Sequence, residues 1–227
     1  MPSILNCKKL QKFDLIRRQE TWTLTLKGWV ITLLFLMTMT LVSCFNLYPF
    51  LAVNAPIQAD ALVIEGWMPD YAIKAALVEF EKGNYQKIIT TGLPLSKGYY
   101  LAEYKDFANL TAATLVKLGL DETQVIAVPA PNVIRNRTDA TAIVLREWLK
   151  TYDLNIKSIN LYSLGPHSRR SWIIFKKYLH PDIKVGIISI PSKEDQAQNW
   201  WLSSEGFRTV ISEFIGYLYT WFFNFLG

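Results

Sequence analysis

One stretch of the chain, residues 163–171, carries side chains suited to acid–base chemistry and to anion binding. It reads Ser-Leu-Gly-Pro-His-Ser-Arg-Arg-Ser and so places His167, Arg169, Arg170 and Ser171 within five positions. An imidazole can donate or accept a proton near neutral pH. A guanidinium group binds phosphate or carboxylate through two parallel hydrogen bonds. We therefore expect His167 to act as an acid or base, and the arginines and Ser171 to bind an anionic ligand.

The elements on either side explain why this stretch would form a site. Residues 156–162 are an apolar run that favours a buried strand, and residues 172–178 favour a helix. In an open α/β sheet, ligands bind at the carboxyl ends of the strands. The first turn of the following helix also offers unpaired backbone N–H groups to an anion. The alternative is that Arg169 and Arg170 are solvated first-turn residues and that His167 is a hydrogen-bonded loop residue.

The rest of the chain alternates between strand and helix patterns. Short Val/Ile-rich runs predict strands at 61–64, 87–91, 125–128, 156–162 and 184–190. Helical spacing or length predicts helices at 69–83, 101–118, 138–152, 172–178, 194–203 and 207–225. This order predicts an α/β fold, with a Rossmann-like, doubly wound and mostly parallel sheet of about five strands.

Right-handed crossovers would bring four strand-end loops to one edge of this sheet. Glu65, at the end of the first strand, is the second candidate for proton transfer. The further candidates for ligand binding are Gly66, Gly92, Glu103, Asn136, Arg137 and Thr138. Thr138 or Asn136 is also a candidate N-cap. The alternatives are a solvated loop residue for Arg137 and a solvated helical residue for Glu103.

Charge and composition exclude several classes of function. The chain has 227 residues and a net charge of +5, but residues 1–27 hold six basic and two acidic residues, and the remainder holds 18 and 17. The nearly neutral remainder argues against a nucleic-acid partner. The two cysteines, Cys7 and Cys44, lie outside the expected domain, and two histidines with scattered acids lack metal-ligand spacing, so we expect no metal. The absence of G-x-G-x-x-G weakens an adenosyl-type cofactor, and the cofactor stays undefined.

A membrane anchor is expected before the domain. Residues 28–48 are uncharged and long enough to cross a bilayer, with Trp29 and Tyr48 near the ends. The basic residues before this segment predict a cytoplasmic tail at 1–27, a single pass through the inner membrane, a linker at 49–58 and an extracytoplasmic domain at 59–227. The alternatives are a cleaved signal peptide and a lipoprotein whose cleavage box ends at Cys44.

The order of these motifs resembles the ElyC/SanA/YdcF family of bacterial envelope proteins over residues 59 to about 190. The resemblance rests on an aspartate at the first strand, a short strand ending in Thr91-Gly92, a Glu-bearing helix, an Asn-x-Thr loop entering a helix, and a strand followed by His-x-x-Arg. It implies that Glu103, Thr138, His167 and Arg170 match the family's motif positions. The chain departs from the family at Glu65-Gly66-Trp67, where many members have a Gly-rich turn, and at Asp139 or Thr141, where the family has Asn.

These observations lead to one functional hypothesis and one rival. The resemblance implies a role in cell-envelope or peptidoglycan maintenance. We expect a membrane-anchored protein that binds a phosphorylated, nucleotide-like or lipid-linked cell-wall intermediate, with hydrolysis or transfer as its reaction. The rival is a non-catalytic ligand sensor or scaffold that uses the same pocket. The apolar helix at 207–225 is expected to pack on the domain with its first half and to face lipid with its aromatic tip.

Overall fold

The computed structural model describes residues 22–152, 155–192 and 199–225. The chain divides into two compact units with the boundary between Leu41 and Val42. This boundary falls within helix α1 (Leu26–Leu51), which starts two residues before and ends three residues after the predicted 28–48. The helix is long and apolar enough to cross a membrane. Most of its apolar side chains are exposed.

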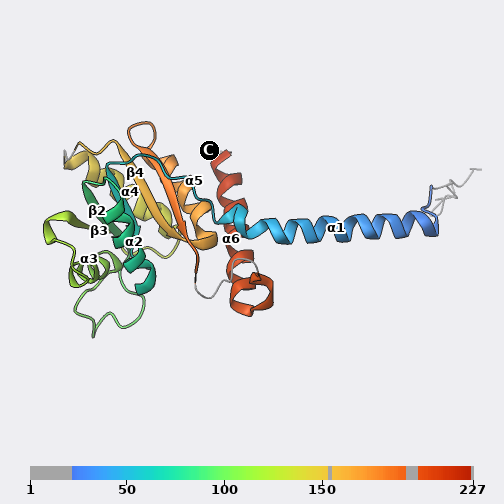
Figure 1. The fold of residues 1–227 in the computed structure, drawn as a ribbon, viewed down its shortest axis with the longest axis horizontal. Coiled ribbons are helices and arrows are strands. Elements are labelled where there is room, and N and C mark those ends of the chain that lie inside the picture. Colours follow the sequence, from blue (N-terminus) through green and yellow to red (C-terminus); the bar gives the residue numbers. More distant parts are fainter. Residues whose placement is uncertain (1–21, 153–154, 193–198, 226–227) are drawn as a thin grey trace, which may run out of the picture. The chain divides into compact units, whose positions relative to one another are not determined.

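The second unit is built on a five-stranded sheet (Figure 1). Its strands are β1 (Ala61–Glu65), β2 (Lys87–Gly92), β3 (Val125–Pro129), β4 (Ser158–Leu164) and β5 (Lys184–Ile190). They run in the order β3-β2-β1-β4-β5, and every pairing is parallel. The predicted α/β fold with a doubly wound sheet is therefore confirmed.

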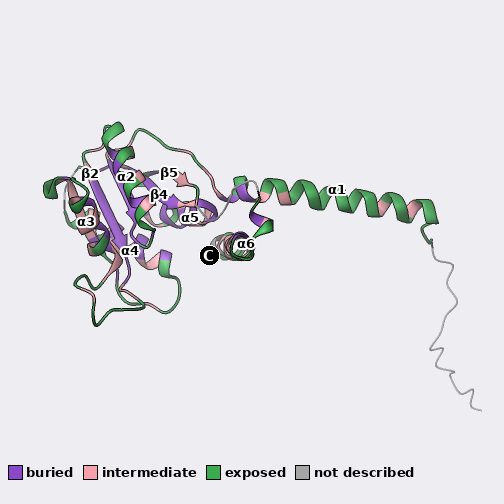
Figure 2. Ribbon diagram, turned by 60° about the horizontal axis from the view of Figure 1, so that its bottom comes forward, coloured by how far each residue is buried: buried purple, intermediate pink, exposed green. Residues whose placement is uncertain are grey.

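Helices cover both faces of the sheet. Successive side chains of a strand point to opposite faces, so Ala61 and Val63 belong to one core cluster, and Leu62 and Ile64 belong to the other. Helices α4 (Arg137–Thr151) and α5 (Ser168–Leu179) pack in the first cluster, and α2 (Asp70–Lys82) and α3 (Phe107–Lys117) in the second. Figure 2 shows the strands buried between the helices. Burial on both faces explains why β1 is apolar at each of its first four positions.

Two helix predictions need correction. The helix predicted at 101–118 begins at Phe107, because the Asp106 carboxylate accepts the backbone N–H of Asn109 at 2.8 Å and caps the first turn. Residues 93–106 form a loop instead. Of the helix predicted at 194–203, residues 194–198 lie outside the described part. The remainder contains the 3₁₀ helix η3 (Trp200–Leu202), and α6 (Ser204–Phe225) follows, three residues earlier than predicted.

The segment after α1 belongs to the folded domain rather than to a free linker. Ala55 exchanges two backbone hydrogen bonds with Ile187 of β5, at 2.8 and 3.1 Å. The side-chain amide of Asn160 accepts the backbone N–H of Ile57 at 3.0 Å and donates to its carbonyl at 2.8 Å. These bonds lay the predicted linker along the sheet, so the end of α1 is joined to the domain by a short, hydrogen-bonded connection.

Candidate functional site

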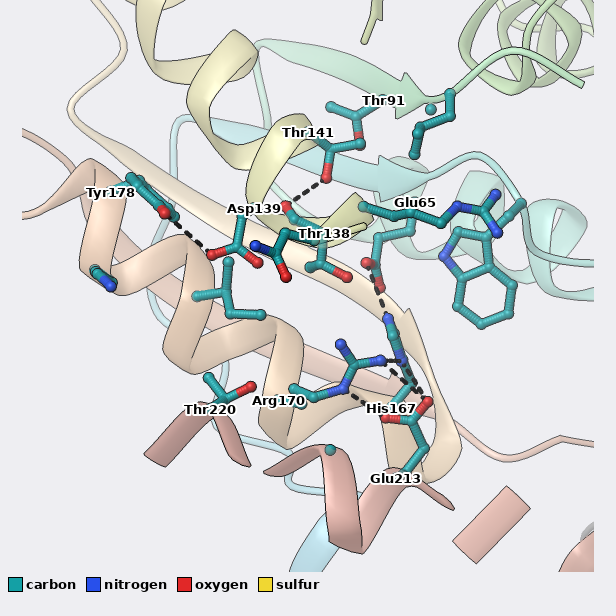
Figure 3. Close-up of a pocket in the computed structure, with 18 of the residues that line it drawn as sticks. Glu65, Thr91, Thr138, Asp139, Thr141, His167, Arg170, Tyr178, Glu213 and Thr220 are labelled. Atoms are coloured by element: carbon teal, nitrogen blue, oxygen red, sulfur yellow. Dashed lines mark hydrogen bonds and ion pairs between the residues drawn. The ribbon is translucent and has the colours of Figure 1, made fainter. Parts of the chain in front are cut away.

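A cavity of about 870 Å³ lies at the carboxyl edge of the sheet. Side chains from β1, β2, α4, α5 and α6 line it (Figure 3). Strands β1 and β4 are neighbours, but β1 leads to a helix on one face and β4 to a helix on the other. Such a switch point is where open α/β sheets bind their ligands. The described residues that bring charge to the cavity are Glu65, Arg137, Asp139, His167, Arg170, Lys177 and Glu213.

Glu65 is a buried carboxylate at the end of β1, with only 4% of its surface exposed. It accepts hydrogen bonds from the hydroxyl groups of Ser163 in β4 and Ser171 in α5, the latter at 2.9 Å. Burial alone would raise the pKa of Glu65, but His167 and the two serines outweigh burial and lower it. Ser171 is fully buried behind Glu65 and does not line the cavity. It therefore positions Glu65, and the expected direct contact with a ligand is not supported.

His167 ends the short 3₁₀ helix η2 (Gly165–His167) and lies between two carboxylates. Its Nδ1 atom is 2.9 Å from Oε1 of Glu213, and its Nε2 atom is 3.5 Å from Oε1 of Glu65. Nε2 is buried, and at this distance it makes no hydrogen bond within the described residues. Burial alone would lower the pKa of His167, but Glu65 and Glu213 outweigh burial and raise it to about 9. At neutral pH the side chain is therefore an imidazolium.

Arg170 is paired with the same Glu213. Its Nε atom donates to Oε2 at 2.8 Å, and Nη2 donates to Oε1 at 3.2 Å. Nη2 also lies 3.0 Å from His167 Nδ1. Both atoms are donors when His167 is protonated, and the Glu213 carboxylate that accepts from both holds the two cations together. Burial alone would raise the pKa of Glu213, but His167 and Arg170 lower it to about 2. Arg170, expected to bind a ligand anion, is thus already occupied by an internal carboxylate.

Sequence reasoning missed Glu213. The residue lies 46 positions after His167, on α6, which the sequence predicts only to cover the sheet and touch lipid. One signal is present, because Glu213 is the only charged residue from Thr209 to the end of the chain. A single carboxylate on an apolar helix needs a charged or hydrogen-bonding partner wherever that helix is buried.

Arg169 does not reach the cavity. Successive residues of a helix point about 100° apart, and Arg169 faces the end of α1 instead. Its guanidinium group lies 4.0 Å from the ring centroid of Phe50, and Nε donates to the Phe50 carbonyl. Its expected role in ligand binding therefore stays a prediction, at a position outside the cavity lining. Through these contacts Arg169 links α5 to the last turn of α1.

The start of α4 supplies donors that the protein itself leaves unused. Asn136 precedes the helix in a left-handed conformation with φ of 54°, and its side chain makes no capping bond. The expected side-chain N-cap at Asn136 or Thr138 is therefore absent. Within the described residues, the Thr138 hydroxyl and the Arg137 guanidinium group have no hydrogen-bond or ion-pair partner, and both line the cavity. Together with the free N–H groups of the first turn, they form a group of hydrogen-bond donors at the cavity wall.

The three remaining candidates lie in different places. A Cβ atom on Gly66 would be 2.5 Å from the Phe107 carbonyl, and a Cβ on Gly92 would be 2.6 Å from the Phe107 Cβ. Both glycines thus let the start of α3 approach the sheet, and only Gly92 lines the cavity. Glu103 is exposed in the loop before α3, away from the cavity lining. Its expected place on a helix facing the site is wrong, because the helix begins four residues later.

Two aspartates that bear on the family resemblance make hydrogen bonds within the protein. Asp60, before the first strand, accepts the backbone N–H groups of Lys157 and Ser158 at 2.8 and 2.9 Å, at the amino edge of the sheet. Asp139, in the first turn of α4, accepts the Tyr178 hydroxyl group at 3.0 Å and lines the cavity. Of these two carboxylates, only Asp139 is placed to influence a ligand.

In the described part of the chain, no three His, Cys, Asp or Glu side chains are arranged to hold a metal ion. Comparison with known proteins adds no assignment, because no family model and no curated protein matches the chain.

Proposed function

We propose that this protein is a membrane-anchored cell-envelope protein of the ElyC/SanA/YdcF type whose cavity binds a phosphorylated ligand, either nucleotide-like or lipid-linked. The observation that carries the proposal is the start of α4, where Arg137 and Thr138 leave their donors unpaired at the cavity wall. A phosphate group accepts hydrogen bonds from guanidinium, hydroxyl and backbone N–H groups alike. Arg170 is not part of this set, since Glu213 occupies it.

The reaction that suits the site is hydrolysis or transfer of the phosphorylated group, with His167 as the proton donor. An imidazolium with a pKa of about 9 is charged at neutral pH and can protonate a leaving-group oxygen. The buried Glu65 stabilises the imidazolium and can take part in returning its proton. Glu213 holds His167 and Arg170 in position from α6.

The second candidate is a non-catalytic sensor, and one observation favours it. His167 Nε2 is buried, and both His167 and Arg170 are engaged in internal ion pairs. Catalysis would require Nε2 to exchange its approach to Glu65 for contact with the bound ligand. A sensor would need no such change, because ligand binding at Arg137 and Thr138 leaves the ion pairs intact.

Binding is tested with the full chain in detergent micelles by titration calorimetry, using inorganic phosphate, a nucleoside monophosphate and a short-chain polyprenyl phosphate. Arg137→Ala should weaken binding about tenfold or more, because a charge-assisted hydrogen bond contributes about 1.5–3 kcal/mol. Arg135→Ala is the matched control, since it removes the same charge from the loop directly before α4, and Arg135 does not line the cavity. Equal effects of the two substitutions, or no binding of any probe, would refute the proposed anion site.

Turnover separates the enzyme from the sensor. With the probe that binds, release of phosphate is followed for the unaltered chain and for His167→Gln. An enzyme loses release in the variant and retains affinity for the probe. A sensor releases no phosphate in either form and still binds.

The proposed location has its own test. We place the residues before α1 in the cytoplasm and the domain outside, because six basic residues precede the apolar segment. A reporter enzyme that is active only outside the cytoplasm, fused after Gly227, should therefore be active. Activity of a cytosol-restricted reporter at the same position would reverse the assigned orientation.

A further inference from the structure

Helix α6 carries an outward apolar stripe. Ile215, Leu218 and Phe222 follow each other at spacings of three and four residues and so lie on one side of the helix. Their exposed fractions are 61%, 45% and 54%. From Phe214 to Phe225 the helix contains no charged residue. An uncovered apolar stripe of this kind on a water-facing surface is unfavourable unless another apolar phase covers it.

The opposite side of α6 belongs to the domain and the cavity. Val210 is fully buried, and Glu213 holds His167 and Arg170. Gly216 and Thr220 follow on the same side and line the cavity. The absence of a side chain at Gly216 matters here, because a Cβ would lie 3.1 Å from Arg170 Nε. These contacts fix the rotation of α6 about its axis, and this rotation turns the apolar stripe away from the domain.

Helix α6 packs beside the end of α1. The helix and η3 pack on the last turns of α1 through the buried cluster Tyr48, Leu51, Trp200 and Val210. Trp200 Nε1 donates to the Cys44 carbonyl at 3.3 Å, and the rings of Phe50 and Tyr217 meet edge to face at 5.3 Å. Residues 42–51 are the end of the helix that is long enough to cross a membrane. Helix α6 therefore lies directly beside the last turns of this helix.

We infer that α6 is a membrane-surface helix whose stripe Ile215–Leu218–Phe222 lies among the lipid headgroups next to the end of α1. Trp221, which is 51% exposed and does not line the cavity, suits this position, because tryptophan rings concentrate at the membrane–water interface. A second copy of the chain would also cover apolar surface. The bilayer is favoured because α6 is joined to the end of the membrane helix, so lipid is already its neighbour.

This placement bears on the site. The helix that contacts lipid with one side supplies Glu213 and part of the cavity wall with the other. Since a helix with its side chains is about 10–12 Å across, the cavity lies within about one helix diameter of the membrane surface. A ligand with a lipid tail could then reach the site without leaving the bilayer. The inference shares with the proposed function only the membrane span of α1.

The test uses the full chain reconstituted in vesicles of phosphatidylcholine and phosphatidylglycerol, with Cys7 and Cys44 replaced by Ser. An environment-sensitive fluorophore is attached at Leu218→Cys or Phe222→Cys, neither of which lines the cavity. Glu81→Cys on the exposed surface of α2 is the control for water, and Leu34→Cys in α1 is the control for the bilayer interior. Quenchers are carried either near the headgroups or deep in the acyl chains.

We expect headgroup-level quenching at 218 and 222 to exceed that at 81 by at least about twofold, since interfacial helices sit about 5–10 Å into the headgroup boundary. If position 34 is quenched by the deep probe but 218 and 222 respond only to aqueous iodide, α1 spans the bilayer and the inference on α6 is wrong. If neither the lipid-borne quenchers nor aqueous iodide reach positions 218 and 222, a second copy of the chain covers the stripe, and the inference that lipid covers it is wrong. Lack of lipid quenching at 34 would refute the span itself and, with it, the basis for α6.

Discussion

Replacing Glu213 with Gln should lower the pKa of His167. That pKa stands at about 9 against an ordinary value of 6.5, a difference of roughly 3 kcal/mol at about 1.36 kcal/mol per unit. Burial opposes protonation, so the two carboxylates together supply more than this difference. In the Gln variant, Glu65 is the one of these two carboxylates that remains to offset the effect of burial on the His167 pKa. Its Oε1 atom lies 3.5 Å from the imidazole, whereas Oε1 of Glu213 lies 2.9 Å away. We expect the pKa to fall by at least about one unit, or roughly 1.4 kcal/mol.

The chain contains only two histidines, which makes the measurement direct. With ¹³C-labelled histidine, the ring signal that remains in a His180→Gln background belongs to His167, and its shift is followed from about pH 5 to 10. Glu147→Gln is the control, because it removes the same charge from a surface pair with Arg146. A pKa below 7 in the unaltered chain, or equal values in the two Glu→Gln variants, would refute the argument that Glu213 keeps His167 protonated.

Three further predictions follow from the same geometry. The folded-state pKa of His167 is raised to about 9, so its contribution to stability is complete below about pH 6.5 and is lost as pH rises through 9. The folded-state pKa of Glu213 is lowered to about 2, so the contribution of Glu213 to stability is present above about pH 4.5 and is lost as pH falls through 2. Urea unfolding of the full chain in micelles should therefore show the greatest resistance from this network between about pH 4.5 and 6.5, and a maximum above pH 9 would contradict it. Arg170→Ala should lower the free energy of unfolding by about 2–3 kcal/mol, because Glu213 loses a two-pronged partner, and a loss under about 0.5 kcal/mol would show that the pair is dispensable. Gly92→Ala should cost about 1–3 kcal/mol, since the new methyl group meets the first residue of α3 at 2.6 Å, and an unchanged melting temperature would mean that α3 moves aside freely.

The order of the elements predicts the fold because the fold follows from local patterns. A strand buried on both faces is apolar at most positions, and the five Val/Ile-rich runs of the sequence overlap the five strands. Parallel strands then require crossover helices and bring the strand ends to one edge. For this reason Glu65 at the end of a strand, His167 just beyond one, and Arg137 and Thr138 at the start of a helix can be assigned to one edge of the sheet from their positions in the sequence alone.

One error is avoidable from the sequence. Apolar spacing places the start of α3 at 101, but Asp106 is a good N-cap residue and the helix begins directly after it. Shifting the start by six positions moves Glu103 out of the helix and out of the site. Capping residues therefore deserve more weight than apolar spacing at this boundary.

The remaining features depend on how distant elements pack. Arg169 and Arg170 are adjacent and chemically identical, yet one fastens α1 and the other binds Glu213, because the rotation of α5 about its axis is set by the sheet beneath it. Glu213 joins the site only because α6 lies across the carboxyl edge and has Gly216 where it crosses Arg170. Local patterns report which residues are buried and which elements form. The ion pairs between elements depend on interhelical distances and rotations, which arise only when the whole domain is packed.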